Sequence, residues 1–262
     1  MGSATTQALA ASTEALAAAS GVSLDTAREL FAAASAVGDS TQLSGALADP
    51  AAPAAARQNV VASVFGGFSE TTRGLLGAVV AERWSSASDL VDGIEELAIR
   101  ATAIAEPQAD IEGEIFGFTR VIADNADLEL ALGGRLGGSD AKGALVERLL
   151  AGGAGAGSTL IVSSLVRRPR DRRVRQLLSR ALRIVSSQRG RVVATVHSAT
   201  SISDAQRARL STALSSRYGG QVSLNVVIDP SVVGGLRVQI ADDVIDGSIA
   251  ARLADLRQKL AG

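Results

Sequence analysis

The feature of this chain that most constrains its fold is an internal repeat within its first 190 residues. When the sequence is shifted by 85 positions, similar residues coincide without a gap from residue 31 to residue 83. The coincident pairs include Phe31 with Phe116, Asp39 with Asp124, Leu47 with Leu132, Arg57 with Lys142, Leu75 with Leu160 and Arg83 with Arg168. Self-similarity at a fixed spacing is typical of a structural unit that is used twice. The repeat predicts two similar units in tandem; the alternative is a chance alignment of two amphipathic helical stretches.

Both units have the sequence pattern of α-helices. Residues 4–190 are mainly Ala- and Leu-rich stretches with apolar residues at spacings of three and four, interrupted by Gly, Pro, Asn and Asp. Aromatic residues make up only 3% of the chain, so small aliphatic side chains must form the cores of closely packed helices. We predict helical bundles over 1–105 and 106–190, with a helix near 88–105 that closes the first and opens the second.

The chain has a different periodicity from residue 191 onward. Apolar and other side chains alternate there, as in strands with one buried face, in the segments 192–196, 222–228 and 236–240. Ser203 and Gln206 form a Ser-x-x-Gln pattern that predicts a helix N-terminus between the first two strands. Asp242 and Asp243 indicate a turn, and a last helix is expected after Ser248. The sequence therefore predicts a mainly α protein whose two bundles precede a small α/β domain over 191–262.

Composition excludes several kinds of site. The chain has no cysteine, which excludes disulfides, thiolate metal sites and cysteine nucleophiles. A formal net charge of −1 creates no overall field that would attract nucleic acid or an anionic membrane. The first basic residue is Arg28, so no signal peptide is expected. The longest uncharged stretch, Leu149 to Val166, contains four glycines and makes a poor membrane span, so we expect a protein that reaches a membrane only through a partner.

The C-terminal segment carries the most specific motif. Residues 229–248 read DPSVVGGLRVQIADDVIDGS, and the closing helix reads IAARLADLRQKL. The acid before a turn, the Gly-Gly pair, the Leu-x-Val-x-Ile strand and the Val-Ile-Asp-Gly-Ser step into a terminal helix resemble the C-terminal signature of delta subunits of rotary ATP synthases. This is the family of the mitochondrial oligomycin-sensitivity-conferring protein. The segments Val37–Leu47 and Ile122–Leu132 both resemble the family's junction between its second and third helices.

The chain departs from the usual family pattern in its length. The usual member has a single N-terminal helical bundle, and this chain is longer by about the length of the repeat. It resembles the long form found in some actinobacterial enzymes. The sequence leaves open which of the two bundles performs the role that the single bundle has in shorter members.

The resemblance implies a structural subunit with no catalytic residues, no cofactor and no metal. In the family, the N-terminal bundle holds the N-terminal helices of the alpha subunits on the catalytic head, with the beta subunit as a further candidate partner. The C-terminal domain holds the end of a b-type stalk chain, so that the torque of the rotor is resisted. One copy per proton-translocating complex is implied, at the cytoplasmic side of the cell membrane, without direct membrane insertion and without nucleic acid.

The resemblance also implies where the partners bind. In the family an alpha-subunit helix lies between the first and fifth helices of the bundle, which correspond in copy one to Ala4–Ala19 and Glu70–Trp84. The candidate groove residues are Leu9, Leu16, Leu75, Val79 and Val80. The alternative interpretation is that these side chains simply form the core of the bundle. In the last helix, support for stalk binding is expected from the apolar stripe of Ile249, Leu253, Leu256 and Leu260.

An arginine-rich segment around Pro169 carries the strongest local charge of the chain. Its members are Arg167, Arg168, Arg170, Arg172, Arg173 and Arg175. A solvated loop between helices is one interpretation, and contact with an acidic surface of a partner subunit is another. The segment 167–175 is also the basis of an alternative function, a helical RNA-binding or antitermination-like module. The near-neutral net charge and the lack of interleaved aromatic residues argue against RNA.

Two further features imitate chemical sites. The glycine-rich segment 152–159 resembles a phosphate-binding loop, but it lacks the lysine before Ser/Thr and follows a predicted helix where a strand is required. We expect a loop between helices there. His197, the single histidine, is predicted in a strand with no acid beside it, so neither a zinc site nor a triad is expected. Trp84, the single tryptophan, is expected to pack at the end of the fifth helix.

Overall fold

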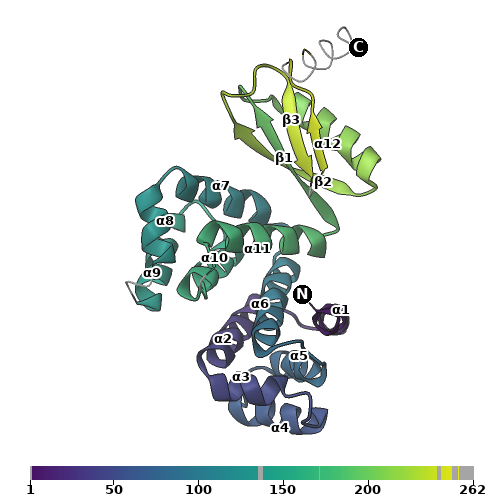
Figure 1. The fold of residues 1–262 in the computed structure, drawn as a ribbon, viewed down its shortest axis with the longest axis vertical. Helices are drawn as coiled ribbons and strands as arrows, with labels where there is room; N and C mark the ends of the chain where they lie inside the picture. Colours follow the sequence, from purple (N-terminus) through teal and green to yellow (C-terminus); the bar gives the residue numbers. More distant parts are fainter. Residues whose placement is uncertain (1, 135–137, 171, 241–242, 250–252, 254–262) are drawn as a thin grey trace. The chain divides into compact units, whose positions relative to one another are not determined.

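The fold consists of a helical unit and an α/β unit (Figure 1). The computed structural model describes residues 2–134, 138–170, 172–240, 243–249 and 253. Residues 1–185 form the first compact unit and residues 186–262 form the second. Both copies of the repeat lie in the first unit, and the region with strand periodicity forms the second.

Serine side chains define the starts of several helices in copy one. Its helices are α1 (Ser3–Ala18), α2 (Leu24–Asp39), α3 (Thr41–Ala48), α4 (Ala54–Val64), α5 (Glu70–Ala81) and α6 (Ala87–Ala105). Ser23, Ser40, Ser69 and Ser86 each accept a hydrogen bond from the backbone amide three positions further on. Each cap satisfies an amide that has no partner inside the first helical turn, which fixes where the helix begins.

The helices of copy two match those of copy one in order and in length. They are α7 (Ile111–Ala123), α8 (Ala126–Gly133), α9 (Ser139–Leu150), α10 (Ala156–Arg167) and α11 (Val174–Gln188). Adding 85 to the bounds of α3 gives the bounds of α8, and the other helices correspond to within about two residues. The tandem repeat is therefore confirmed. The same offset relates α1 to α6 and α6 to α11, so α6 is the last helix of copy one and the first of copy two.

Helix α6 is buried on nearly every side because both copies pack on it. It contacts α1, α2, α3 and α5 of copy one and α10 of copy two. Most of its side chains between Leu90 and Ala103 are buried, and one hydrophobic cluster extends through both copies. Trp84 packs in this core just beyond α5, where its Nε1 donates to the Val79 carbonyl oxygen at 2.8 Å. Its ring lies against Gly93 of α6, where any Cβ atom would overlap it.

The second unit is a mixed four-stranded sheet with one helix in its first crossover. Its strands are β1 (Arg191–Ser198), β2 (Gln221–Ile228), β3 (Leu236–Ile240) and β4 (Asp243–Asp246), in the order β2-β1-β3-β4. β1 is parallel to β2 and antiparallel to β3, and β4 is antiparallel to β3. α12 (Asp204–Tyr218) joins β1 to β2 and begins with the predicted capping box of Ser203 and Gln206. Leu214 of α12 packs on Ala194, Val196, Val222, Val238 and Ile240.

The sequence-based expectations for the end of the chain are only partly realised. A turn was expected at 242–243, but Asp243 already belongs to β4, an edge strand that the periodicity did not predict. Most of the expected last helix, including Leu256 and Leu260, lies outside the described residues. Ile249 and Leu253 are described, and each is 51% exposed.

Candidate partner-binding surfaces

The candidate groove residues of copy one lie at the interface between its first and fifth helices. α1 packs against α5, as expected. Leu16, Leu75, Val79 and Val80 are at most 3% exposed and belong to the core, whereas Leu9 is only partly buried. Their positions therefore agree with the alternative that most of these side chains stabilise the bundle itself. Direct contact between them and a partner helix stays a prediction.

In both copies a glutamate on the second helix fixes the start of the fifth helix. In copy one, Glu29 of α2 accepts hydrogen bonds from the Ser69 amide at 3.1 Å, from Ser69 Oγ at 2.7 Å and from Thr72 Oγ1 at 2.5 Å. Burial raises the pKa of Glu29, but these hydrogen bonds outweigh that effect and lower the pKa overall. In copy two, Glu114 lies 85 positions after Glu29 and accepts a hydrogen bond from the Gly155 amide at 2.9 Å. Each copy thus supplies its own anion to a helix N-terminus.

The carboxylates of Glu114 and Glu106 explain why the glycine-rich segment 152–159 is not a phosphate-binding loop. Glu114 and Glu106 accept hydrogen bonds from the amides of Gly155 and Gly157 at 2.9 and 3.0 Å, so amides that a phosphate loop would offer to its ligand are already engaged. Two negative charges at that place would repel a phosphate. The preceding element is the helix α9, as expected, so the segment connects two helices.

In both copies a buried cation on the fourth helix donates a hydrogen bond to the carbonyl group at the end of the third helix. In copy one, Arg57 donates to the carbonyl oxygens of Asp49 at 3.3 Å and Ala81 at 3.0 Å. In copy two, Lys142 donates to the carbonyl oxygen of Gly134, the position equivalent to Asp49. Arg57 and Lys142 are only 6% and 8% exposed. The sequence comparison paired these two cations but did not predict their role, because a helix end that needs a donor is visible only in the fold.

The arginine-rich segment is bound to acidic side chains of the chain itself. Arg167 pairs with Asp140 and Glu147, Arg168 with Asp39, Arg175 with Glu129, and both Arg170 and Arg172 pair with Asp92 and Glu95. Arg173 is exposed, and the described part of the chain shows no ion pair for it. The interpretation of the segment as a freely solvated loop is therefore wrong for five of the six arginines. Their contact with an acidic partner subunit stays a prediction.

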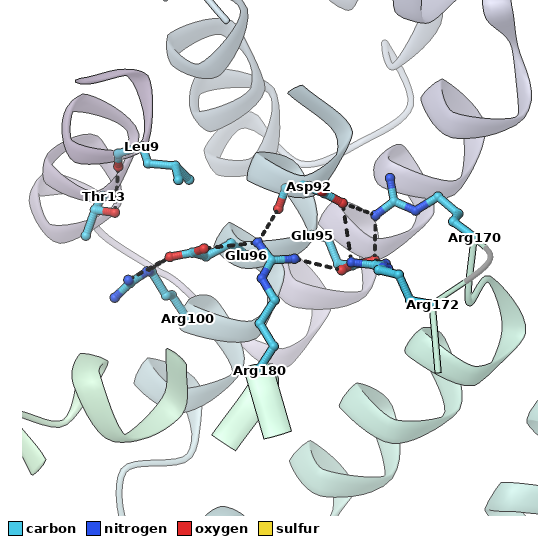
Figure 2. Close-up of polar contacts among 9 residues, drawn as sticks. All are labelled: Leu9, Thr13, Asp92, Glu95, Glu96, Arg100, Arg170, Arg172 and Arg180. Atoms are coloured by element: carbon cyan, nitrogen blue, oxygen red, sulfur yellow. Dashed lines mark hydrogen bonds and ion pairs between the residues drawn. The ribbon is translucent and has the colours of Figure 1, made fainter. Parts of the chain in front are cut away.

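Glu95 of α6 is the centre of this ion-pair network (Figure 2). It accepts from Arg170 at 3.0 Å, from Arg172 at 2.9 Å and from Arg180 of α11 at 3.3 Å, and its side chain is only 8% exposed. The adjacent Glu96 pairs with Arg180 at 3.2 Å and with Arg100 at 2.7 Å. The sequence did carry a signal, since three acids at 92, 95 and 96 lie among the apolar residues of the predicted helix near 88–105. Acids buried in such a helix require cationic partners.

The expectation that His197 has no acid beside it is wrong. Its Nδ1 lies 3.6 Å from Oδ2 of Asp229, because parallel β1 and β2 bring the two strand ends together. The pKa of Asp229 is lowered, first by the hydrogen bond from Ser231 Oγ at 2.6 Å, then by the Ser231 amide, with a smaller contribution from His197. The contact between His197 and Asp229 therefore joins the turn after β2 to the end of β1. Sequence reasoning missed it because the two residues are 32 positions apart and only the parallel register joins them.

Neither a metal site nor a membrane span is found in the described residues. No group of three or more His, Asp or Glu side chains there could hold a metal ion. No helix in that part of the chain is long and apolar enough to cross a membrane.

Comparison with known proteins decides the family. The family model of the ATP synthase delta (OSCP) subunit matches residues 97–260. An ATP synthase subunit delta from Leifsonia xyli is 48% identical over the full length of both chains. Those from Streptomyces avermitilis and Nocardia farcinica are 39% and 38% identical, over 90% and 92% of this chain and 88% and 91% of their own. The chain belongs to the ATP synthase delta (OSCP) subunit family.

The delta-family match also distinguishes the two copies. It begins at Leu97, inside α6, and therefore covers copy two together with the second unit. Copy one precedes that match, although the Leifsonia relative aligns with it as well. Copy two and the second unit together are thus the part of the chain that the family model describes. The candidate groove residues, which were placed in copy one, lie before the matched region.

Proposed function

We propose that this chain is a non-catalytic subunit of the peripheral stalk of a proton-translocating ATP synthase, where it links the catalytic head to the stalk. The observation that carries the proposal is the 48% identity, over the full length of both chains, to an ATP synthase subunit delta. As a stator, the subunit resists the torque that the rotor exerts on the head. That role requires durable contacts and a stiff body, and it requires no reaction chemistry.

The architecture of the helical unit favours such a mechanical role. A helix shared by two bundles transmits a load between them without an intervening linker, and α6 is buried in both. The ion pairs of Glu95 and Glu96 add directional contacts on the same helix. Close-packed interiors have low compressibility, so a load applied to one copy displaces the other with little deformation.

The two units are proposed to bind different partners. The helical unit binds the N-terminal helices of the alpha subunits, with the beta subunit as a further contact, through an apolar helix-in-groove interface. The second unit binds a b-type stalk chain, supported by Leu253, Leu256 and Leu260 of the expected last helix. One copy per complex is proposed, at the cytoplasmic side of the cell membrane. The RNA-binding alternative receives no support, since the relatives are named as ATP synthase subunits and five of the six arginines are paired with acids.

A truncation tests this division of labour. The chain without Ser248–Gly262 and the full chain are each titrated, by surface binding, against the isolated alpha/beta head and against the b-type chain. The truncated chain should retain head binding and lose binding to the b-type chain. Normal binding of the truncated chain to the b-type chain would show that residues 248–262 are not needed for stalk binding. A full chain that binds neither partner would overturn the proposed function.

A further inference from the structure

β2 is an edge strand of the second unit and has a neighbouring strand on one side only. In the sheet order β2-β1-β3-β4, β1 pairs with it in parallel, and no strand pairs with its other side in the described part of the chain. Helix α12 covers the beginning of that other side. Ser211 Oγ donates to the Val222 carbonyl oxygen at 3.0 Å, and the Val222 amide donates to Ser215 Oγ at 3.1 Å. The backbone groups of Val222 therefore point away from β1 and are satisfied by α12.

The second half of this edge has no such cover. Alternate residues of a strand direct their amide and carbonyl groups to the same side, so Leu224, Val226 and Ile228 also turn theirs away from β1. The other set of residues agrees with this assignment, since the Asp229 amide donates to a carbonyl oxygen of β1 at 2.8 Å. No hydrogen bond to the outward groups of the three residues is present in the described part of the chain. The open edge, residues 224–228, thus offers a row of backbone donors and acceptors.

The two edges of the sheet differ in how they are protected against pairing with another chain. β4 has only four residues, and it begins and ends with the aspartates Asp243 and Asp246. Short edge strands and charged side chains discourage the addition of a further strand. β2 has eight residues, with the sequence QVSLNVVI, and contains neither a charge nor a proline. Ile228 at its end is 53% exposed, so a strand that pairs with the open edge would also cover an apolar side chain.

The length of the open edge limits which partner it can hold. Five residues of strand are about 17 Å long, and pairing along them buries much less than the roughly 800 Å² per partner of a standard stable interface. A second copy of this chain, held by the open edge alone, would therefore associate only weakly. A partner that already contacts the second unit elsewhere can use so short an edge, because its strand then binds at a high effective concentration. The b-type stalk chain is proposed to be such a partner.

We infer that an extended segment of the b-type stalk chain pairs with the open edge and adds a strand to the sheet beside β2. This inference rests on the proposed function and names the mode of its stalk contact. The segment is uncharged along the open edge and has no proline where its amides donate to β2. It carries apolar side chains on the α12 face of the sheet, where Leu224 and Val226 pack on the core and Ile228 is exposed. Main-chain hydrogen bonds supply affinity, and the apolar contact with Ile228 supplies selectivity.

Two substitutions on opposite edges of the sheet form a matched pair. The side chains of Ile228 and Val244 are 53% and 49% exposed, on β2 and β4. Ile228→Lys places a charge where the added strand must pair and should weaken binding of the b-type chain at least tenfold, whereas Val244→Lys should leave the affinity unchanged. Val226→Pro removes one outward amide and no hydrogen bond to β1, so it should also weaken binding about tenfold. Urea denaturation checks that each variant is folded, and the two lysine variants decide if Val226→Pro is not.

Residue-resolved amide hydrogen exchange of the full chain, with and without the b-type chain, tests the pairing itself. The amides of Leu224, Val226 and Ile228 should exchange at least tenfold more slowly in the complex. The amide of Val244 should not change, although it also points away from the sheet, since the Gly247 amide donates back to β3.

Three results would contradict the inference, and each has a different meaning. A complex that forms without slower exchange at the open edge, or that binds both lysine variants equally, would overturn the inference and leave the proposed function intact. Slower exchange that needs no b-type chain and increases with protein concentration would identify a second copy of this chain as the occupant. If the full chain forms no complex with the b-type chain, both the inference and the proposed stalk contact are wrong.

Discussion

The two copies of the helical repeat have the same internal supports and different surroundings. Glu29 and Glu114 hold the start of the fifth helix, and Arg57 and Lys142 close the end of the third. These interactions satisfy backbone groups at helix ends that have no partner inside the helix, so each copy benefits from a suitable anion and cation at these places. The comparison shows that a duplicated bundle retains the polar groups that its own backbone requires.

The outer surfaces of the copies have diverged. Leu130 of copy two is 73% exposed, and the equivalent residue of copy one is Gly45. Val121 of copy two is 46% exposed, where copy one has Ala36. In contrast, Val91 and Glu95 of α6 are buried, whereas the equivalent Thr6 and Ala10 of α1 in copy one are exposed. Surface residues are constrained by what they contact, so this pattern indicates that the two copies face different neighbours.

The largest expected effect tests whether the copies share one core through α6. Leu97→Ala removes a fully buried side chain of α6 and should lower the free energy of unfolding by about 2–5 kcal/mol in urea titrations. Hydrogen exchange should accelerate in α2 and α10 together. Leu132→Ala in α8 removes an equally buried leucine of copy two alone and serves as the control. Faster exchange confined to one copy in Leu97→Ala would contradict a shared core.

The next effect concerns the ion-pair network between the copies. Glu95→Gln leaves three arginines without the carboxylate that they share and should lower the free energy of unfolding by about 2 kcal/mol. Asp140→Asn breaks only an exposed ion pair with Arg167 and should change the free energy of unfolding by less than about 1 kcal/mol. The two variants are compared by thermal unfolding at low and high salt. If both substitutions lowered the free energy of unfolding equally, the network around Glu95 would contribute no more than an ordinary surface ion pair.

A smaller effect compares the cations that close the third helix. Arg57→Met leaves two partly buried carbonyl groups without their donor, and Lys142→Met leaves one. Each should be destabilising, by about 1–3 kcal/mol, with the larger loss for Arg57→Met. Chemical denaturation of both variants checks the order. The reverse order would show that the two copies do not use this interaction equivalently.

The smallest effect is a pH dependence that belongs to copy one. Because hydrogen bonds hold the pKa of folded Glu29 below its ordinary value of 4.5, its carboxylate stabilises the fold above that value. This contribution is lost as the pH falls through the lowered pKa, when the carboxylate becomes protonated. Glu29→Gln should therefore lower the melting temperature at pH 7 and make it vary less between pH 6 and about pH 3. An unchanged pH profile would exclude Glu29 as a source of acid sensitivity.

Much of the fold could be predicted from the sequence because periodicity is a local signal and the repeat recurs at a fixed spacing. The shift of 85 predicted the tandem bundles, and alternation predicted three of the strands. β4 was not predicted because its four residues, which begin with Asp243, show too little alternation to be distinguished from a turn. The C-terminal motif alone was specific enough to indicate the family.

The contacts between distant residues could not be predicted in the same way. The partners of Arg168 and Arg170 lie 129 and 78 positions away, and the pairing of His197 with Asp229 depends on the strand register. A cluster of arginines indicates charge, but the fold decides whether that charge meets solvent, a partner or the chain itself. The burial of Leu16 and Val79 likewise depends on how α1 and α5 pack, since apolar residues at helical spacing form a core and a groove equally well.

The most direct test of the account is a calorimetric titration of the full chain with the N-terminal peptide of the alpha subunit from the same organism. We expect one site per chain, with an affinity around micromolar or better, which corresponds to roughly −8 kcal/mol. A single site follows because α2 packs against α6 and α10, the first and fifth helices of copy two, whereas Thr6 and Ala10 on the first helix of copy one are exposed. Two equivalent sites, or no binding, would contradict it.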